Sequence, residues 1–421
     1  MISQTIKEHP EAIKMENKPL SGIKVVELAT VVAAPSCGRL LAALGADVIK
    51  VEPPKGDPWR LVYAVIGKGF DELEDPIFDI CNSGKRTISI DIKNPRGYDL
   101  LMELIGDADV FLTNTRARSL RKLNLDPNSI RERFPGIIYA SLTSYGDKGP
   151  EADKPGFDNS AFWTRIGFAR DTAIETEGCY PMNLPTGVGD SISGMALCNN
   201  ILAALISRGK TGKGDYVSVS LYGVGLWVMG TMILRSQERY GAGFPINRER
   251  CNPTSTAYKC SDGRWVLIAI LEYKRHAPVM FEALGYPDIM SDPRFSTHED
   301  FWNNSAILLK MAEESFLKKS SDEWLEIFAG LDIACERLNS INEALEDEQA
   351  WLNGYLEHYD MLCGESCVIS RMPINLESFE IPPSPLAPLF GENTAEILTG
   401  MGYSEQEIES LAADGAVVTR N

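Results

Sequence analysis

The sequence predicts an α/β fold: a Rossmann-like large domain with a doubly wound parallel sheet, plus a smaller α+β domain. Two observations carry this prediction. Between residues 23 and 142, patterns of buried strands alternate with helical patterns, and strands joined by helices lie parallel in one sheet. From about residue 252 the pattern changes to a hairpin followed by amphipathic helices. We expect the large domain to comprise residues 1–225 and 330–421, and the small domain residues 226–329.

The opening βαβ unit lacks the glycines of a dinucleotide site. Residues 23–28 are an apolar, β-branched strand, and Pro35 suits the first turn of the helix that follows, because an N–H there would have no partner. A second strand at residues 46–52 completes the unit. The turn between strand and helix reads ATVVAAP instead of G-x-G-x-x-G, so the backbone has no glycines with which to approach a pyrophosphate. This disfavours NAD and FAD, although Glu52 stands where a ribose-binding carboxylate would.

The rest of the large domain continues the alternation. Strands are expected at residues 86–92, 109–113, 137–142 and 217–221, and helices at 94–105, 119–133, 158–169 and 191–207. In the small domain, STAYKC and RWVLIAI flank a Ser261-Asp262-Gly263 turn and predict a hairpin. Parallel α/β sheets bind ligands beyond the carboxyl ends of their strands, so the site is expected at that edge.

Composition excludes several classes of function. A formal net charge of −18 over 421 residues argues against a nucleic-acid partner, since such binding depends on neutralising phosphates. The nine cysteines form no CxxC pair, which favours reduced thiols and gives no zinc motif. The polar N-terminus does not resemble a signal peptide, so a cytoplasmic location is expected. The uncharged stretch around residues 216–234 contains polar residues and glycines, and we interpret it as a buried helix or interface segment, with no membrane partner.

The common catalytic motifs are missing from the sequence. It contains no GxSxG, HExxH or P-loop, and no histidine lies between residues 10 and 275. Acid–base or nucleophilic chemistry in the α/β region therefore needs carboxylates, lysine, cysteine or tyrosine. The segment GVGD at residues 187–190 follows Pro185 and not a strand, so it is discounted as a dinucleotide motif.

Asp158 is the residue that stands out, in the segment KPGFDNSAFW. It follows a strand and a turn, and it precedes a helical pattern. From pattern alone, a helix N-cap is the favoured interpretation, because aspartate caps helices well. The alternative is a carboxylate nucleophile at the sheet edge, able to form covalent acyl intermediates. Periodicity does not separate the two.

Segments spread along nearly the whole chain resemble the class III CoA-transferase family (CaiB/BaiF type). In the family's order they are PLSGIKVVEL, APSCGRLLAALGADVIKVEPPKGDPWR, GKRTISIDIK, SLTSYGDKGP, KPGFDNSAF, TGVGDSISGMAL, RGKTGKGDYVSVSL and GENTAEILTGMGYSEQEI. The resemblance implies a homodimer of two interlocked ring-like subunits and a catalytic nucleophile at Asp158. It also implies coenzyme A, bound as an acyl-CoA substrate, with no permanently bound cofactor and no metal.

The resemblance also implies where CoA is held. The densest basic cluster, residues 116–122, reads by itself as a solvated helix face, yet the family places a phosphate-binding arginine where Lys122 falls. Another CoA-contacting basic position of the family aligns with Pro53, two residues before Lys55. The residues expected to contact CoA are Val32, Ala33, Lys55, Arg121, Lys122, Tyr145 and Gly146.

Departures from one branch of the family indicate the subtype. Val32 stands where formyl-CoA transferases carry a glutamine, and residues 251–254 (CNPT) replace their glycine loop. The segments PGFDNSAFW, PINRERCNP and DEQAWLNGYL are similar to the clostridial 2-hydroxyacyl CoA-transferases, which implies an acyl- or 2-enoyl-CoA donor and an (R)-2-hydroxy acid acceptor, such as phenyllactate or 2-hydroxyisocaproate. Two alternatives are a racemase-type isomerase, against which the absence of a nearby histidine argues, and a non-catalytic CoA-binding protein.

Overall fold

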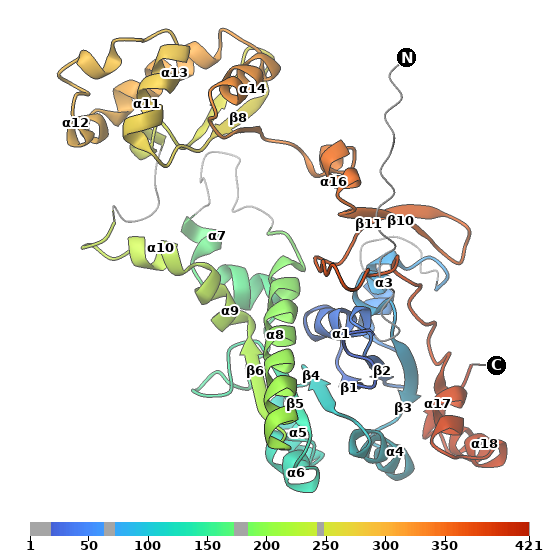
Figure 1. Ribbon diagram of the computed structural model, residues 1–421. Helices are drawn as coiled ribbons and strands as arrows, with labels where there is room; N and C mark the ends of the chain where they lie inside the picture. Colours follow the sequence, from blue (N-terminus) through green and yellow to red (C-terminus); the bar gives the residue numbers. More distant parts are fainter. Residues whose placement is uncertain (1–17, 63–71, 172–183, 242–247, 421) are drawn as a thin grey trace. The chain divides into compact units, whose positions relative to one another are not determined.

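A computed structural model describes residues 18–62, 72–171, 184–241 and 248–420 (Figure 1). The chain divides into two compact units, the first comprising Met1–Ile233 with Gln349–Asn421 and the second Leu234–Glu348. The second unit begins and ends later than the small domain expected from the sequence, residues 226–329. The first three residues of the PINRERCNP segment lie outside the described residues.

The first unit is built on a seven-stranded sheet in the order β12-β3-β2-β1-β4-β5-β6. Its strands are β1 (Lys24–Leu28), β2 (Asp47–Glu52), β3 (Arg86–Ile90), β4 (Val110–Thr113), β5 (Ile138–Thr143), β6 (Tyr216–Ser220) and β12 (Val417–Val418). All neighbouring strands pair in parallel except β12, which pairs antiparallel to β3. The expected doubly wound sheet is confirmed. Its strand order reverses between β1 and β4, which is where ligands of such sheets bind.

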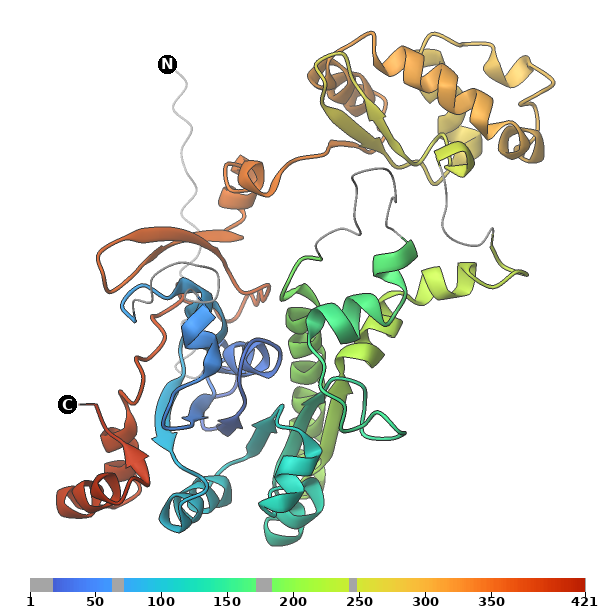
Figure 2. The same ribbon diagram turned by 180° about the vertical axis from the view of Figure 1, so that it is seen from behind.

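Both faces of the sheet are covered. Alternate residues of one strand point to opposite faces, so Val25 of β1 joins one hydrophobic core and Val26 the other. The first core packs against α1 (Ala33–Ala43) and α8 (Val188–Thr211), which lie side by side in both views (Figures 1 and 2). The second packs against α4 (Pro95–Gly106), α6 (Pro127–Arg133), α17 (Thr394–Gly400) and α18 (Glu405–Ala413).

Glycine sets the spacing between α1 and α8. A Cβ on Gly194 would lie 2.6 Å from the carbonyl oxygen of Ala33, so a larger residue would push the two helices apart. By length and composition alone α8 could cross a membrane, and 44% of its most apolar window is buried inside the structure. Leu197 and Ile201 are fully buried in the first core, which identifies α8 as a core helix of this unit.

Two predicted helices are wrong in their extent. The expected helix at 119–133 is two helices, α5 (Ala117–Lys122) and α6, because Asn124 adopts a left-handed φ of 50° and Asp126 caps a new helix that starts at Pro127. The expected helix at 158–169 is a short π-helix, η2 (Asp158–Thr164), followed by α7 (Phe168–Asp171).

The stretch around residues 216–234 forms β6, α9 (Leu221–Val228) and α10 (Gly230–Arg235). It is not a buried helix: the Trp227 side chain is 82% exposed, and Val228 and Leu234 are also exposed. The other half of the prediction, an interface segment, stays a prediction.

Shorter elements complete the first unit. They are η1 (Pro58–Leu61), α3 (Pro76–Asn82), α16 (Glu348–Leu352) and an antiparallel hairpin of β10 (Leu356–Asp360) and β11 (Ser366–Ser370). Pro76 and Pro95 begin α3 and α4 behind the capping residues Asp75 and Asn94.

The second unit has its own core. The predicted hairpin is confirmed as β7 (Ala257–Lys259) and β8 (Trp265–Ile268), and β9 (Cys335–Arg337) completes an antiparallel sheet. Its helical elements are η3 (Arg248–Arg250), α11 (Tyr273–Ala283), η4 (Ile289–Ser291), α12 (His298–Asn303), α13 (Ser305–Phe316), α14 (Ser321–Gly330) and α15 (Ile341–Ala344). Buried aromatic residues fill the core, with Phe316 in contact with Tyr258, Trp324 and Phe328.

Candidate active site

A cavity of about 270 Å³ opens at the carboxyl ends of β1, β4 and β5. It is lined by residues 30–33, 114–117, 142–144 and 154–157, with Ala152, Asp190 and Leu221. The cavity therefore lies beside the point where the strand order reverses, at the edge of the sheet expected from the sequence.

Thr30 and Asn114 join the loops that follow β1 and β4. The Asn114 side-chain amide donates to the Thr30 carbonyl oxygen at 2.8 Å, and the Thr30 N–H donates to Asn114 Oδ1 at 3.1 Å. This reciprocal pair fixes two walls of the cavity to each other. The sequence did not single out Asn114, although a polar residue directly after a strand at the switch point is a usable signal.

Asp158 is not a helix N-cap, so the interpretation favoured from pattern alone is wrong. Phe157 occupies the cap position of η2, and its N–H donates to Ser160 Oγ at 2.9 Å. Asp158 is the first residue within the helix, and it is 2% exposed. It lies behind the cavity wall, next to the lining residues Phe157 in sequence and Asp190 in space.

The Asp158 carboxylate faces the start of α8. Its Oδ2 accepts a hydrogen bond from the Gly187 N–H at 2.7 Å, whereas its buried Oδ1 has no hydrogen-bond partner among the described residues. A Cβ on Gly189 would lie only 2.2 Å from Oδ1, so glycine is required there. The GVGD segment that was discounted as a dinucleotide motif therefore forms part of this site, because a helix N-terminus attracts a carboxylate as well as a phosphate.

Burial governs the protonation of two carboxyl groups here. Burial raises the pKa of Asp158, while the N–H groups of Gly187 and Gly189 oppose that rise. Asp190 is 8% exposed, and burial together with the negative charge of Asp158 raises its pKa to about 7. Perturbed carboxyl groups beside a cavity are typical of catalytic sites.

The structure brings together some of the predicted CoA-contacting residues. Val32 and Ala33 line the cavity, but Lys55, Arg121 and Lys122 are exposed and lie outside its lining. Arg121 forms an ion pair with Asp153 at 2.7 Å. That these three side chains bind parts of CoA outside the cavity stays a prediction.

Tyr145 and Gly146 also lie outside the cavity lining. Both are half-buried, and they follow the lining residue Ser144. The Gly146 N–H donates to Thr143 Oγ1 at 3.1 Å, which shapes the turn after β5. Lys154, a lining residue, places its ammonium 5.0 Å from the centre of the Tyr145 ring, so the turn contacts the cavity wall.

A family model described as CoA-transferase family III matches residues 20–394. The chain belongs to this family. It is 36% identical to the (R)-2-hydroxy-4-methylpentanoate CoA-transferase of Clostridioides difficile, over 93% of this chain and 98% of that protein. It is also 36% identical to the cinnamoyl-CoA:phenyllactate CoA-transferase of Clostridium sporogenes, over 96% of this chain and 99% of the relative.

Two solved structures share the fold. Rv3272 from Mycobacterium tuberculosis superposes with a TM-score of 0.78 at 26% identity, covering 90% of this chain and 98% of that one. A CaiB/BaiF family protein from Brucella suis gives a TM-score of 0.75 at 28% identity, covering 92% of this chain and all of the other. The family resemblance inferred from the sequence is confirmed, and the protein is an enzyme that uses acyl-CoA substrates.

Two cationic side chains that the sequence did not single out individually line the cavity, Arg116 and Lys154, and Lys154 is paired with Glu151 at 2.7 Å. Replacing either with alanine is expected to raise the KM for acyl-CoA about tenfold at low salt, because each removes a charge facing an anionic substrate. The matched control is Arg133→Ala, on the exposed end of α6 outside the lining. Steady-state kinetics in low and high salt measure the effect. An unchanged KM in both cavity variants, with an increase in Lys122→Ala, would assign CoA binding to the surface cluster.

Proposed function

We propose that this family III CoA-transferase moves CoA from an acyl-CoA donor to a carboxylic acid through an aspartyl-CoA thioester on Asp158. One observation carries the proposal. A buried carboxylate next to the cavity has one oxygen held by the Gly187 N–H at the start of a 24-residue helix, and the Gly189 N–H and the Trp163 indole also lower its pKa. A carboxylate held in this way is fixed in position and protected from water, as a covalent nucleophile of acyl transfer must be.

The proposed reaction conserves atoms and electron pairs at each step. A carboxylate oxygen of Asp158 attacks the thioester carbonyl, the C–S bond breaks, and CoA thiolate leaves a mixed anhydride. The thiolate then attacks the aspartyl carbonyl and releases the donor acid as its carboxylate, which leaves the aspartyl-CoA thioester. The acceptor carboxylate repeats the two steps in the opposite direction and departs as the new acyl-CoA. Each step exchanges one activated acyl bond for another, so no net proton transfer is required.

The surroundings of Asp158 suit this chemistry. The mixed anhydride and the thioester both react with water, and Asp158 is 2% exposed. Negative charge develops on the aspartyl carbonyl oxygen whenever the thiolate or an acceptor attacks it. The Gly187 N–H, 2.7 Å from Oδ2 and at the positive end of α8, is positioned to stabilise that charge.

We further propose that the acceptor is a 2-hydroxy acid with an apolar side chain. Val32, Leu142 and Leu221 contribute aliphatic surface to the cavity, which suits a hydrocarbon group better than a second carboxylate. The two clostridial relatives are named for a branched aliphatic and an aromatic acid. The homodimer implied by the resemblance also belongs to this proposal, and the exposed Trp227 on α9 offers apolar surface for it.

A panel assay tests the proposed substrates. The purified protein is incubated with an acyl-CoA or enoyl-CoA donor and with (R)- and (S)-2-hydroxy acids, their 3-aryl analogues and short dicarboxylic acids, and new CoA esters are identified by mass spectrometry. The proposal predicts transfer to apolar 2-hydroxy acids. Transfer to dicarboxylic acids alone would refute this substrate class, and exchange of the donor's Cα hydrogen without any transfer would indicate the isomerase alternative.

The titration of Asp190 predicts a pH dependence. Asp190 loses its proton as the pH rises through about 7, which adds a second negative charge to a site that must accept a carboxylate. The KM for the acceptor acid is therefore expected to increase about threefold to tenfold between pH 6 and pH 8. Asp190→Asn, which is similar in shape and cannot ionise, is expected to remove this dependence. The same slope in both proteins would show that Asp190 does not face the acceptor.

A further inference from the structure

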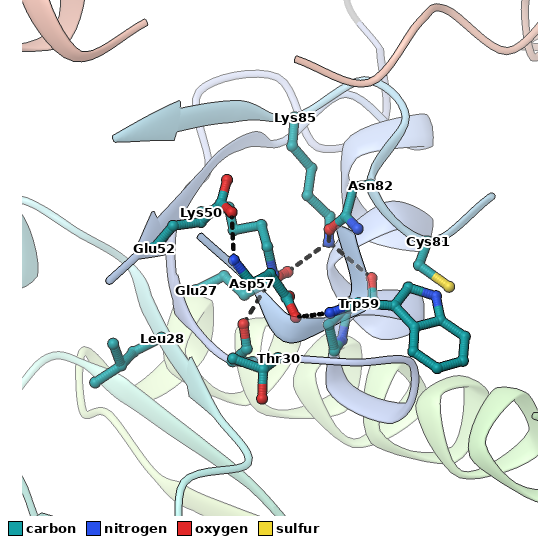
Figure 3. Close-up of polar contacts among 12 residues, drawn as sticks. Glu27, Leu28, Thr30, Lys50, Glu52, Asp57, Trp59, Cys81, Asn82 and Lys85 are labelled. Carbon is teal, nitrogen blue, oxygen red and sulfur yellow. Dashed lines mark hydrogen bonds and ion pairs between the residues drawn. The ribbon is translucent and has the colours of Figure 1, made fainter. Parts of the chain in front are cut away.

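Four buried charged residues lie beneath the loop that follows β1 (Figure 3). Lys50 Nζ lies 3.2 Å from a carboxylate oxygen of Glu27 and 2.8 Å from Asp57 Oδ2, and Lys85 Nζ lies 2.8 Å from the other oxygen of Glu27. The side chains of all four residues are inaccessible to solvent. Buried ions of this kind persist only when each is paired, so the positions of these side chains are strongly constrained.

This network holds the backbone of the loop at two points. Lys50 Nζ donates to the Ala29 carbonyl oxygen at 2.8 Å, and Asp57 Oδ1 accepts from the Val31 N–H at 3.1 Å. Between these two points, Thr30 is bound by Asn114 through both its N–H and its carbonyl oxygen. The next residues, Val32 and Ala33, line the cavity together with Thr30 and Val31.

Val31 is strained. Its φ is 69°, a left-handed conformation that β-branched side chains rarely adopt, because Cβ then crowds the backbone. Such a conformation persists only where the surroundings impose it, and it is found preferentially at functional sites. The partner that the Val31 N–H has in this conformation is Asp57.

Asp57 is itself fixed from two sides. Its N–H donates to Glu52 Oε2 at 2.8 Å, and Glu52 is held in turn by Arg60, so that its pKa falls to about 2 even though burial opposes ionisation. Asp57 Oδ2 is paired with Lys50, and Oδ1 accepts from the backbone N–H groups of Trp59, at 2.9 Å, and Val31. The Asp57 carboxylate thus links the buried ion pairs to the Val31 N–H in the loop that lines the cavity.

We propose that Asp57, fixed by Lys50, is a positioning residue that holds Val31 in its left-handed conformation and thereby shapes the wall formed by residues 31–33 against the acyl-CoA. This inference rests on the proposed function in one respect, that the cavity is the acyl-CoA site. Asp57 itself is not one of the residues that line the cavity.

The test is a rescue experiment. Asp57→Ala removes the acceptor of the Val31 N–H, so the loop relaxes and the KM for acyl-CoA is expected to rise about tenfold with kcat changed less than threefold. Adding Val31→Gly is expected to restore the KM to within about threefold of the wild-type value, since glycine adopts a positive φ without strain. Val31→Ala keeps Cβ and is expected to restore less. The matched control is Asn124→Gly, a second left-handed position of the same unit, which should restore nothing.

A milder variant covers the case in which Asp57→Ala fails to fold, because the alanine leaves Lys50 short of a counter-charge. Lys50 and the Val31 N–H contact different oxygens of Asp57, so in Asp57→Asn the amide oxygen faces one of them and the NH2 group opposes the other donor. A smaller rise in KM than in Asp57→Ala, with the same rescue, is therefore expected. A KM that does not respond to position 57, or a rise that Val31→Gly leaves unchanged, would overturn the inference. Because every variant retains Asp158, an inactive wild-type protein or an active Asp158→Ala variant would instead refute the proposed function.

Discussion

Replacing Asp158 with alanine is expected to lower kcat at least about 10³-fold while binding of acyl-CoA persists. The reason is that the carboxylate is the proposed covalent acceptor of the acyl group and then of CoA. Asp190 also carries a carboxyl group next to the cavity, but its raised pKa of about 7 leaves it largely protonated below neutral pH. Steady-state turnover and calorimetric binding of CoA measure the two effects separately.

Asn159→Ala is the matched control for this variant. Asn159 is the next residue of η2 and its side chain is exposed, so its removal is expected to change turnover less than threefold. An Asp158→Ala protein that retains more than a tenth of wild-type turnover would contradict the nucleophile assignment. Loss of CoA binding together with turnover would show that the residue supports the cavity structurally.

Gly189→Ala is expected to cause the second largest loss, about 10²-fold in kcat. The new Cβ would lie 2.2 Å from Asp158 Oδ1 and 2.4 Å from the Phe162 ring, so the carboxylate or the start of α8 must move. Either movement displaces the nucleophile from the position that the Gly187 N–H imposes on it. The measurement is kcat at saturating donor, with thermal unfolding recorded alongside.

Gly209→Ala provides the control in the same helix. Nothing lies within 4 Å of a Cβ at position 209, so alanine is expected to leave activity unchanged and to stabilise the protein by about 0.5–1 kcal/mol. Equal kcat values for Gly189→Ala and Gly209→Ala would contradict the close packing of α8 against Asp158.

The fold could be predicted because its signals are local. The strands from β1 to β6 lie within one or two residues of their expected positions, since a buried strand and an amphipathic helix each leave their own period in the sequence. The break between α5 and α6 was missed, although Asp126-Pro127 is a recognisable helix start. Apolar and basic residues continue at helical spacing before and after this break, so the two helices resemble one.

The site was only partly predictable, because its decisive contacts are tertiary. Sequence pattern favoured a cap role for Asp158, and only the structure shows that its hydrogen bond goes to Gly187, 29 residues away. The link from Asp57 to Val31 spans 26 residues and depends on a backbone angle that no composition rule indicates for valine. The edge of the sheet that holds the cavity was predictable, since parallel topology alone places it.

The most direct measurement is mass spectrometry of the protein after incubation with an acyl-CoA donor and no acceptor. The mechanism predicts that the peptide containing Asp158 gains the mass of CoA less one water, that hydroxylamine removes this adduct, and that adding an acceptor acid discharges it at the rate of turnover. A protein that turns over normally with donor and acceptor, yet gains no adduct on this peptide when incubated with donor alone, would contradict covalent catalysis by Asp158.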